Sequence, residues 1–478
     1  MRERSAFFAA CCIAATALSV LLAGCESSES KAQEAYGEYQ AAIAGGDLLA
    51  ARRALRAVVA IKDDDPTIWA QLGNIQLQLQ DNEGAYSSFT RAHELDRTNV
   101  GTLAALTQLA LLSGNPENAE KHANELELVA PGHPAVKLAY GYLFLQRQEF
   151  DQADAQADSL LQTLPYEPGA KLLKARILLG RKEPEKAVAL LQDQVRVQPQ
   201  DSGSWKALML IAERQNDWKA VRQAARRLRE INPKDQEISI TVVEASLRTN
   251  DFETALRDSE SLLTPDAPPD QVNAVLELWA KHWRASEAIV EARRLAKAAS
   301  AQQRLAYATF FNEAGSPEDA TALIGSDPSL PVNAANMSVN SVIATSLALR
   351  GDRARAKQIF DAILAHEPDH VYALRGRINL EIATRNGKAA ILDAQRLVSV
   401  EPNSARHRIL LARAYAAAGD SREADRTLWD AFHEIPGDFD AYETLRARVQ
   451  RTGDEAALSS LDEEFKHQRD DLLAREFI

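Results

Sequence analysis

The sequence predicts an all-α solenoid, in which helical hairpins stack one on the next and share a continuous core. Two residue types recur every 34 residues. The prolines are Pro131, Pro165, Pro199 and Pro233, then Pro368, Pro402 and Pro436. The alanines are Ala51, Ala85, Ala119, Ala153, Ala187 and Ala255, then Ala356, Ala390 and Ala424. An interval of this length in helix-forming sequence is typical of a two-helix repeat.

One unit, residues 66–99, shows why each hairpin forms. The first helix has an apolar face at i, i+3 and i+4, formed by Trp69, Leu72 and Gly73. Polar residues 81–84 predict the turn, and Ala85, Phe89 and Ala92 form the stripe of a second helix. The small residues are expected where the two helices approach closely. The recurring proline follows the second helix because proline cannot continue it.

Trp-x2-Leu-Gly, then Ala-x3-Phe, then Pro resembles the tetratricopeptide repeat (TPR) family. The resemblance implies a right-handed superhelix and a surface that binds other proteins, and it covers nearly the whole chain. The phase predicts 13 units, with two irregular ones beginning at about Pro269 and Ala301. The regular units are expected to begin at Ala32, Pro66, Val100, Pro134, Pro168, Ser202, Gln236, Met337, Val371, Ala405 and Phe439.

Two proline-containing interruptions, residues 264–269 and 325–331, break the repeat. They predict a first TPR segment at 32–265, an irregular TPR-like segment at 266–335 and a second TPR segment with a capping repeat at 336–478. The interruptions are either bends between rigid segments or longer loops within one continuous superhelix.

The first 25 residues predict export. A short basic start and an apolar run over residues 6–22 end in Leu-Ala-Gly-Cys25. This ending resembles a bacterial lipobox, which implies a signal peptide at 1–24, an acylated Cys25 and a lipidated tether at 25–31. The resemblance, with Glu26 rather than Asp after the cysteine, implies the periplasmic face of the outer membrane. The alternative is an uncleaved anchor, for which the run is short.

Charge argues against nucleic-acid binding, and cysteine content argues against disulfide bonds. The chain has a formal net charge of −13, and removal of residues 1–24 leaves 53 basic against 67 acidic side chains. An exported acidic protein is a poor nucleic-acid binder. Cys11 and Cys12 would leave with the signal, so no disulfide is expected. The arginine run Arg222, Arg226, Arg227 and Arg229 is interpreted as a solvated helix face.

No enzyme, cofactor or metal site is expected. His366-Glu367-Pro368-Asp369-His370 matches a zinc-protease motif, but proline cannot sit inside the helix that this motif requires. The two histidines are therefore expected on either side of a turn. His282 and His433 are interpreted as ordinary, partly buried residues.

The concave surface is the candidate binding site. Mapping TPR groove positions places Tyr36, Asn74 and Tyr142 in an N-terminal groove for a peptide or helix. Leucines 77, 111, 145, 179 and 247 share one position there, either lining the groove or packing on the next repeat. The C-terminal groove would contain Tyr372, Arg375, Asn379, Arg406 and Arg413, which partly resemble a clamp for a C-terminal carboxylate or an anionic polymer. The alternative is surface charge paired with Glu381 or Asp393.

These observations predict an outer-membrane-anchored TPR scaffold that mediates protein–protein interactions in a cell-envelope assembly or secretion system. The alternative is a component of exopolysaccharide export or of an exosortase-linked system. A repeat-bearing hydrolase is the third hypothesis, and no catalytic residue supports it.

Overall fold

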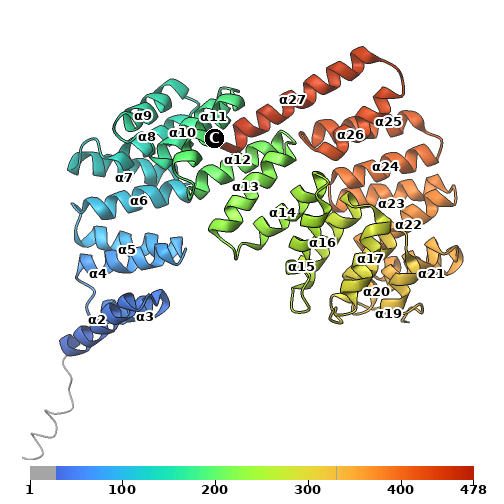
Figure 1. Ribbon diagram of the computed structural model, residues 1–478, viewed down its shortest axis with the longest axis horizontal. Coiled ribbons are helices and arrows are strands. Elements are labelled where there is room, and N and C mark those ends of the chain that lie inside the picture. The colour runs from blue at the N-terminus through green and yellow to red at the C-terminus, as the bar shows by residue number, and fades with distance from the viewer. Residues whose placement is uncertain (1–27, 330, 478) are drawn as a thin grey trace, which may run out of the picture. The chain divides into compact units, whose positions relative to one another are not determined.

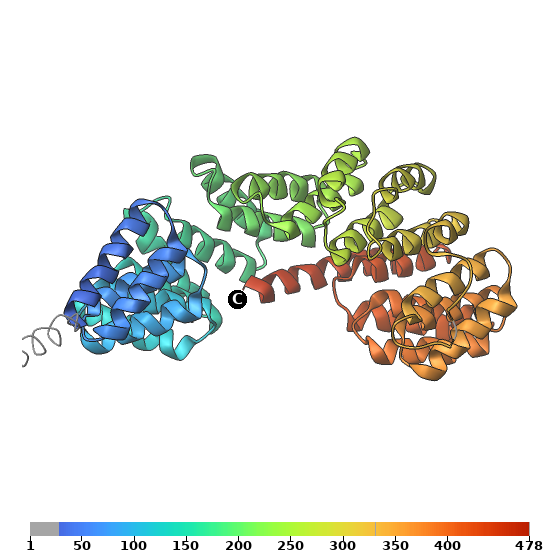
Figure 2. The same ribbon diagram turned by 90° about the horizontal axis from the view of Figure 1, so that it is seen from below.

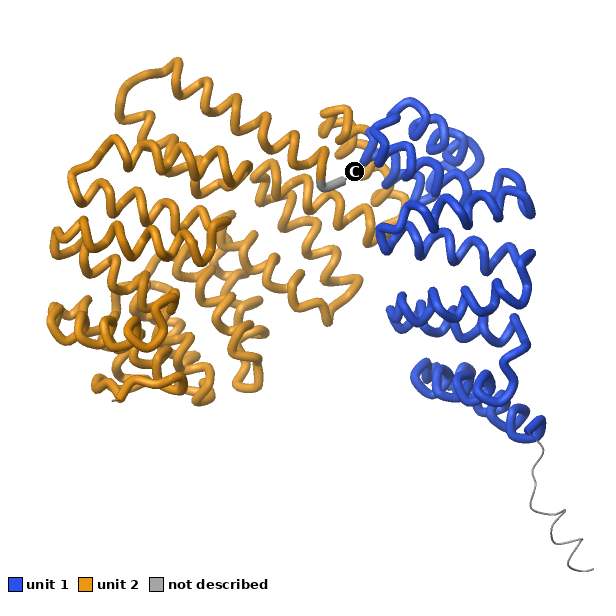
Figure 3. The backbone as a smooth tube through the Cα atoms, turned by 180° about the vertical axis from the view of Figure 1, so that it is seen from behind, with its two compact units in different colours: residues 1–177 blue, residues 178–478 orange. Residues whose placement is uncertain are grey.

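A computed structural model describes residues 28–329 and 331–477, and this part of the chain contains 26 α-helices and no strand. The chain divides into two compact units, residues 1–177 and 178–478, with the boundary inside helix α10 (Figure 3). Each unit is described by itself.

Every hairpin has a first helix and a second helix. The first helices are α2 (Ser28–Ala44), α4 (Pro66–Gln78), α6 (Val100–Leu112), α8 (Pro134–Gln146), α10 (Pro168–Gly180), α12 (Ser202–Arg214), α14 (Gln236–Arg248), α16 (Pro269–His282), α18 (Arg304–Glu313), α20 (Met337–Leu349), α22 (Val371–Ala383), α24 (Ala405–Ala417) and α26 (Phe439–Gln450). The second helices are α3 (Leu48–Ile61), α5 (Asn82–Leu95), α7 (Pro116–Val129), α9 (Phe150–Thr163), α11 (Pro184–Val197), α13 (Trp218–Ile231), α15 (Phe252–Leu262), α17 (Ala285–Ala296), α19 (Pro317–Ile324), α21 (Arg353–His366), α23 (Gly387–Val400), α25 (Ser421–Glu434) and α27 (Glu455–Phe477).

The predicted repeats are confirmed. Eleven of the 13 first helices begin at the predicted residue, and Figure 1 shows them alternating with second helices. The first helix begins at Ser28 rather than Ala32, because Ser28–Lys31 extends it with Glu29 in its first turn, where a carboxylate is favourable. Helix α18 begins at Arg304, three residues after its approximate prediction.

In the unit at residues 66–99 the turn lies earlier than predicted. Residues 82–84 are already helical, because the Asp81 carboxylate caps α5 by accepting a 3.0 Å hydrogen bond from the Gly84 amide. The turn is made by Gln80, whose φ of 61° is left-handed. A left-handed residue stands at the same place in twelve hairpins: Gly46, Gln80, Gly114, Gln148, Lys182, Asn216, Asn250, Gly315, Gly351, Arg385, Gly419 and Gly453. Such a residue ends one helix and turns the chain into the next.

The phase-marking residues occupy the positions predicted for packing. Ala85, Ala153 and Ala390 are fully buried in second helices. At Gly73 the space is needed for a neighbouring side chain, since a Cβ there would lie 2.9 Å from the Phe89 ring. Each recurring proline comes two residues after a second helix, as Pro165 follows α9.

In unit 2 the core runs through both interruptions. One hydrophobic cluster extends from Val243 to Val342, and Ile324 packs against both this cluster and the next one. The buried Gln303 amide donates to the carbonyls of Thr264 (3.0 Å) and Ala267 (2.8 Å), which fixes the first interruption. At the second interruption Asn340 exchanges two 2.9 Å hydrogen bonds with the Ser329 backbone.

The last helix returns to an early helix of the same unit. Helix α27 runs from α26 back to α12 (Figures 1 and 2), and Asp471 of α27 forms a 2.8 Å ion pair with Lys182. The Gly437 amide also donates to the Gln468 side chain of α27 at 3.0 Å.

The predicted signal peptide and Cys25 lie outside the described residues. Among the helices that are described, none is both long enough and apolar enough to span a membrane.

Candidate functional site

A cavity of about 520 Å³ lies in unit 2 and is lined by first helices that are distant in sequence. The curvature of the solenoid in unit 2 places α14 and α16 opposite α22, α24 and α26, and the cavity lies between these helices. Its lining residues are Arg248, Lys281, His282, Arg375, Asn379, Arg406, His407, Ile409, Leu410, Arg413, Phe439, Asp440, Glu443 and Thr444. Four of the predicted groove residues are among them, namely Arg375, Asn379, Arg406 and Arg413.

The cavity is positively charged in an acidic protein. Its wall carries four arginines and one lysine against two carboxylates, Asp440 and Glu443. Lys281 donates a 2.7 Å hydrogen bond to Asp440 across 159 residues of sequence. This contact joins α16 to α26 and neutralises one charge of each sign, and Glu244 pairs with Arg248 at 2.8 Å. Arg375, Arg406 and Arg413 then face the carboxylates of Glu313 and Glu443, which leaves a small positive surplus for a ligand.

The three predicted arginines are incompletely neutralised. Arg375 and Arg406 both donate to one oxygen of Glu313, at 3.1 and 3.3 Å. Arg413 is exposed and forms no ion pair with any side chain in residues 28–329 or 331–475. One carboxylate therefore serves two guanidinium groups while the third has none, and guanidinium forks suit carboxylate or phosphate groups.

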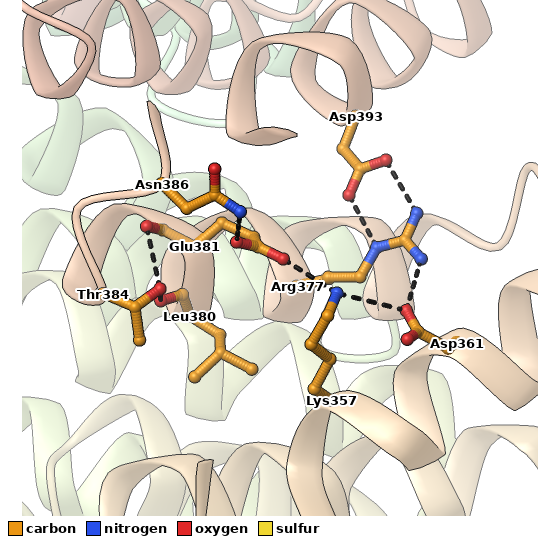
Figure 4. Close-up of polar contacts among 8 residues, drawn as sticks. All are labelled: Lys357, Asp361, Arg377, Leu380, Glu381, Thr384, Asn386 and Asp393. Carbon is orange, nitrogen blue, oxygen red and sulfur yellow. Dashed lines mark hydrogen bonds and ion pairs between the residues drawn. The ribbon is translucent and has the colours of Figure 1, made fainter. Parts of the chain in front are cut away.

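The predicted alternative partners, Glu381 and Asp393, are occupied elsewhere (Figure 4). Asp393 accepts two 2.7 Å hydrogen bonds from Arg377, which also donates to Asp361 at 2.7 Å. Glu381 accepts from Lys357 at 2.9 Å and from Asn386 at 2.5 Å. Arg375 is therefore paired with neither predicted acid: its partner is Glu313, and its neighbour Arg377 binds Asp393 instead.

Two histidines of the cavity are held neutral. Burial, followed by the charges of Arg248 and Lys281, lowers the pKa of His282 to about 4. Its buried Nε2 atom has no hydrogen-bond partner in the described structure. Burial also lowers the pKa of His407, although Glu401 lies 3.3 Å from its Nδ1 atom and opposes the shift. His282 is partly buried, as interpreted from the sequence, but its place in the cavity could not be predicted because it depends on a fold that joins α14, α16 and α26.

The other predicted groove residues do not line this cavity. Tyr372 is exposed on α22, with its ring 6.2 Å from that of His370. In unit 1, Tyr36 accepts a 3.4 Å hydrogen bond from Gln71, Asn74 is exposed, and Tyr142 lies under the guanidinium of Arg176 at 5.3 Å. Of the leucines at the shared position, Leu145, Leu179 and Leu247 are buried, which agrees with the packing alternative.

The histidine predictions have mixed outcomes. His366 ends α21 and His370 caps α22 by accepting from the Ala373 amide at 3.2 Å, so the two stand on either side of a turn as predicted. His433 is exposed rather than partly buried, and it lies 3.1 Å from Glu464. This difference arises because His433 is on the outer side of α25, stacked on Trp429.

The arginine run of α13, interpreted from the sequence as a solvated face, lies on a partly exposed helix face where each arginine is paired with an acid. Arg222 and Arg226 lie 2.8 and 3.9 Å from Asp251, Arg227 pairs with Glu230, and Arg229 lies 3.0 Å from Asp258. None of these arginines lines the cavity.

No protein-family model and no curated protein matches the chain. Among solved structures it is similar to MamA, with 14% identity, a TM-score of 0.31, and coverage of 35% of this chain and 92% of that one. Pseudomonas aeruginosa PilF is 17% identical with a TM-score of 0.32, covering 42% and 91%. PilW, a type IV pilus biogenesis factor, is 16% identical with a TM-score of 0.33, covering 41% and 91%. From its own helical hairpins, buried alanines and helix-ending prolines, the described chain is an all-α solenoid of the tetratricopeptide type.

Proposed function

We propose that this protein is a non-enzymatic TPR scaffold that captures a protein partner through the cationic cavity of unit 2. The observation that supports this most directly is the surplus of arginine and lysine around Arg375, Arg406 and Arg413 in a chain of net charge −13. Like charges gathered in an acidic body are costly to hold together unless an anion joins them. Ile409, Leu410 and Phe439 add an apolar part to the wall, which suits a peptide with an acidic end or acidic side chains.

The test compares two arginine pairs with a labelled oligoglutamate peptide as the probe. Arg375→Ala with Arg413→Ala should weaken binding at least tenfold, because charge-assisted hydrogen bonds contribute about 1.5–3 kcal/mol each. The same variant should reduce the salt dependence of binding, because fewer cations then face the anion. The matched control is Arg222→Ala with Arg226→Ala on α13, whose arginines are already paired. If the control pair weakens binding and the cavity pair does not, the site is assigned to the wrong surface.

An anionic polysaccharide is the second candidate, because the same cations suit the carboxylates of a polyuronate chain. This would place the protein in exopolysaccharide export. An oligouronate measured beside the oligoglutamate probe separates the two functions. Tighter binding of the sugar, lost in the cavity variant, would favour export, and binding of the peptide alone would favour the scaffold.

We also propose that Cys25 is acylated and anchors the scaffold to the periplasmic face of the outer membrane. The lipobox supports this. The first described helix begins at Ser28, so the anchor would hold unit 1 close to the lipid. Cys25→Ser should yield an unprocessed or soluble protein in membrane fractionation. Recovery of the substituted protein in the outer membrane at normal size would show a different anchor.

A further inference from the structure

Three metal-ligand side chains meet in unit 1, far from the cavity residues in sequence. His93 lies in the last turn of α5, and His122 and Glu125 lie three residues apart on α7. Residues at i and i+3 share a helix face, and this spacing of carboxylate and imidazole is used by metal-binding helix bundles. One donor atom of each of the three side chains lies within 4.8 Å of the other two.

The donor atoms lack the hydrogen bonds that buried polar atoms normally have. His122 Nδ1 and Glu125 Oε2 are buried without a hydrogen-bond partner in the described structure, and His93 turns its Nε2 atom, rather than its unpartnered Nδ1 atom, toward Glu125. Glu125 Oε2 is 2.8 Å from His93 Nε2 and 3.9 Å from His122 Nδ1. The first pair is a close contact without a hydrogen bond, so the lone pairs of Glu125 Oε2 stay available to a ligand.

We propose that His93, His122 and Glu125 bind a divalent transition-metal ion of the zinc class, with water completing the coordination. Two imidazole nitrogens and one carboxylate oxygen are a donor set that zinc accepts, whereas calcium and magnesium prefer oxygen alone. With neutral imidazoles the set carries one negative charge, which favours a divalent cation.

The distances need only a small adjustment to hold the ion. Bonds of about 2.0–2.1 Å in tetrahedral geometry place neighbouring donor atoms roughly 3.3 Å apart. The 2.8 and 3.9 Å separations lie on either side of that value. Rotation of the half-buried Glu125 side chain can equalise these two separations, and the two imidazole donors, already within 4.8 Å of each other, must approach to the same value.

Tyr86 and Lys121 complete the surroundings. The Tyr86 hydroxyl lies 3.3 Å from His122 Nε2. It can accept a hydrogen bond from the Nε2–H group, which leaves the Nδ1 lone pair for the ion. Lys121 is exposed on α7, where solvent screens its charge. Bound in this way, the ion would join the second helices of two successive hairpins.

The test measures zinc binding to the full, untagged chain in detergent after treatment with a chelator. Equilibrium dialysis should give about one zinc ion per chain, with no comparable uptake of magnesium or calcium. His122→Gln and Glu125→Gln should each lower the affinity at least tenfold, and Tyr86→Phe should lower it about tenfold. X-ray absorption of the loaded protein should show nitrogen and oxygen neighbours from two imidazoles and a carboxylate.

His433→Gln is the matched control, because His433 and Glu464 form an exposed histidine–glutamate pair without a second imidazole. It should leave zinc binding unchanged. Circular dichroism and melting in chelator separate lost ligands from lost folding, since Glu125→Gln keeps the shape of the side chain. Zinc uptake that is equal in wild type, His122→Gln and Glu125→Gln, or absent from wild type, would overturn the proposal.

Discussion

Arg377 and Arg375 stand two residues apart on α22, yet they belong to different regions of unit 2. Arg377 lies on the packed side, where α21, α22 and α23 meet, and carboxylates of Asp361 and Asp393 satisfy its guanidinium (Figure 4). Arg375 lies on the concave side and shares one Glu313 oxygen with Arg406. A rotation of about 200° around a helix separates the two side chains. The difference shows that a charged residue in a solenoid is structural or available for binding according to the face it occupies.

The largest expected effect comes from overfilling the packed side. Ala390→Trp should destabilise unit 2, and Ala153→Trp unit 1, by about 3 kcal/mol or more, because both alanines are fully buried and overpacking is costly. Thermal and urea unfolding would measure this. Leu392→Trp is the control, since Leu392 is 69% exposed on the same helix as Ala390. Unchanged melting of both alanine variants would show that the packed and open faces are misassigned.

Removal of one arginine from each side tests the comparison directly. Arg377→Ala should lower the free energy of unfolding by about 1–3 kcal/mol, because it leaves Asp393 and Asp361 without their donor. Arg375→Ala should change stability by less than about 0.5 kcal/mol, since Arg375 makes one 3.1 Å contact and Arg406 remains as a partner for the same Glu313 oxygen. Arg396→Ala, which breaks an exposed pair with Asp369, is the control for Arg377. Equal costs for Arg375 and Arg377 would remove the distinction between the two faces.

The pH dependence of the free energy of unfolding should show the titration of His282 on the concave side. His282 has a folded pKa of about 4, against an ordinary value of 6.5, because of burial and nearby cations. The unfolded chain therefore binds its proton first, so stability should fall as the pH drops from 6.5 toward 4. We expect a loss of about 1–2 kcal/mol, less than the full shift implies because the cavity is open to water. In urea titrations at pH 7 and pH 4.5, His282→Asn should lose less stability than wild type, and an identical loss would contradict the assignment.

The smallest expected effect concerns the turn between α22 and α23. Arg385 adopts a left-handed φ of 59°, a place that Gly351 and Gly419 occupy in neighbouring hairpins. Arg385→Gly should stabilise unit 2 by about 0.5–1 kcal/mol, because it relieves the cost of a side chain in this conformation. Gly419→Ala should have the opposite sign. Binding of the oligoglutamate probe should be the same in both variants, because neither residue lines the cavity.

The repeats could be predicted because their signals are local. An apolar stripe, a small residue and a proline can all be recognised within one hairpin, and the phase located the first helices from α4 to α16 at their observed first residues. The turn was placed too late because Asp81 and Asn82 are polar in either role, and only the cap on Gly84 shows that the helix has begun.

The sites could be predicted only in part, because they depend on helices far apart in sequence. The groove periodicity identified Arg375, Arg406 and Arg413, which one series of first helices presents on one side. It could not identify Lys281 or His282, which meet Asp440 across about 160 residues. Nor could it pair His93 with His122 and Glu125, because that requires the stacking of α5 on α7.

Contact between α27 and α12, with the Lys182–Asp471 ion pair, gives unit 2 an unusual mechanical property. An open solenoid extends under tension like a spring, because each repeat touches only its neighbours. In unit 2 the Lys182–Asp471 ion pair also joins the first and last hairpins, and the Lys281–Asp440 ion pair joins α16 to α26. Force applied to its two ends must therefore break these distant bonds before the coils can separate. Because both ion pairs are exposed to solvent, they should protect the shape of the cavity against small loads only.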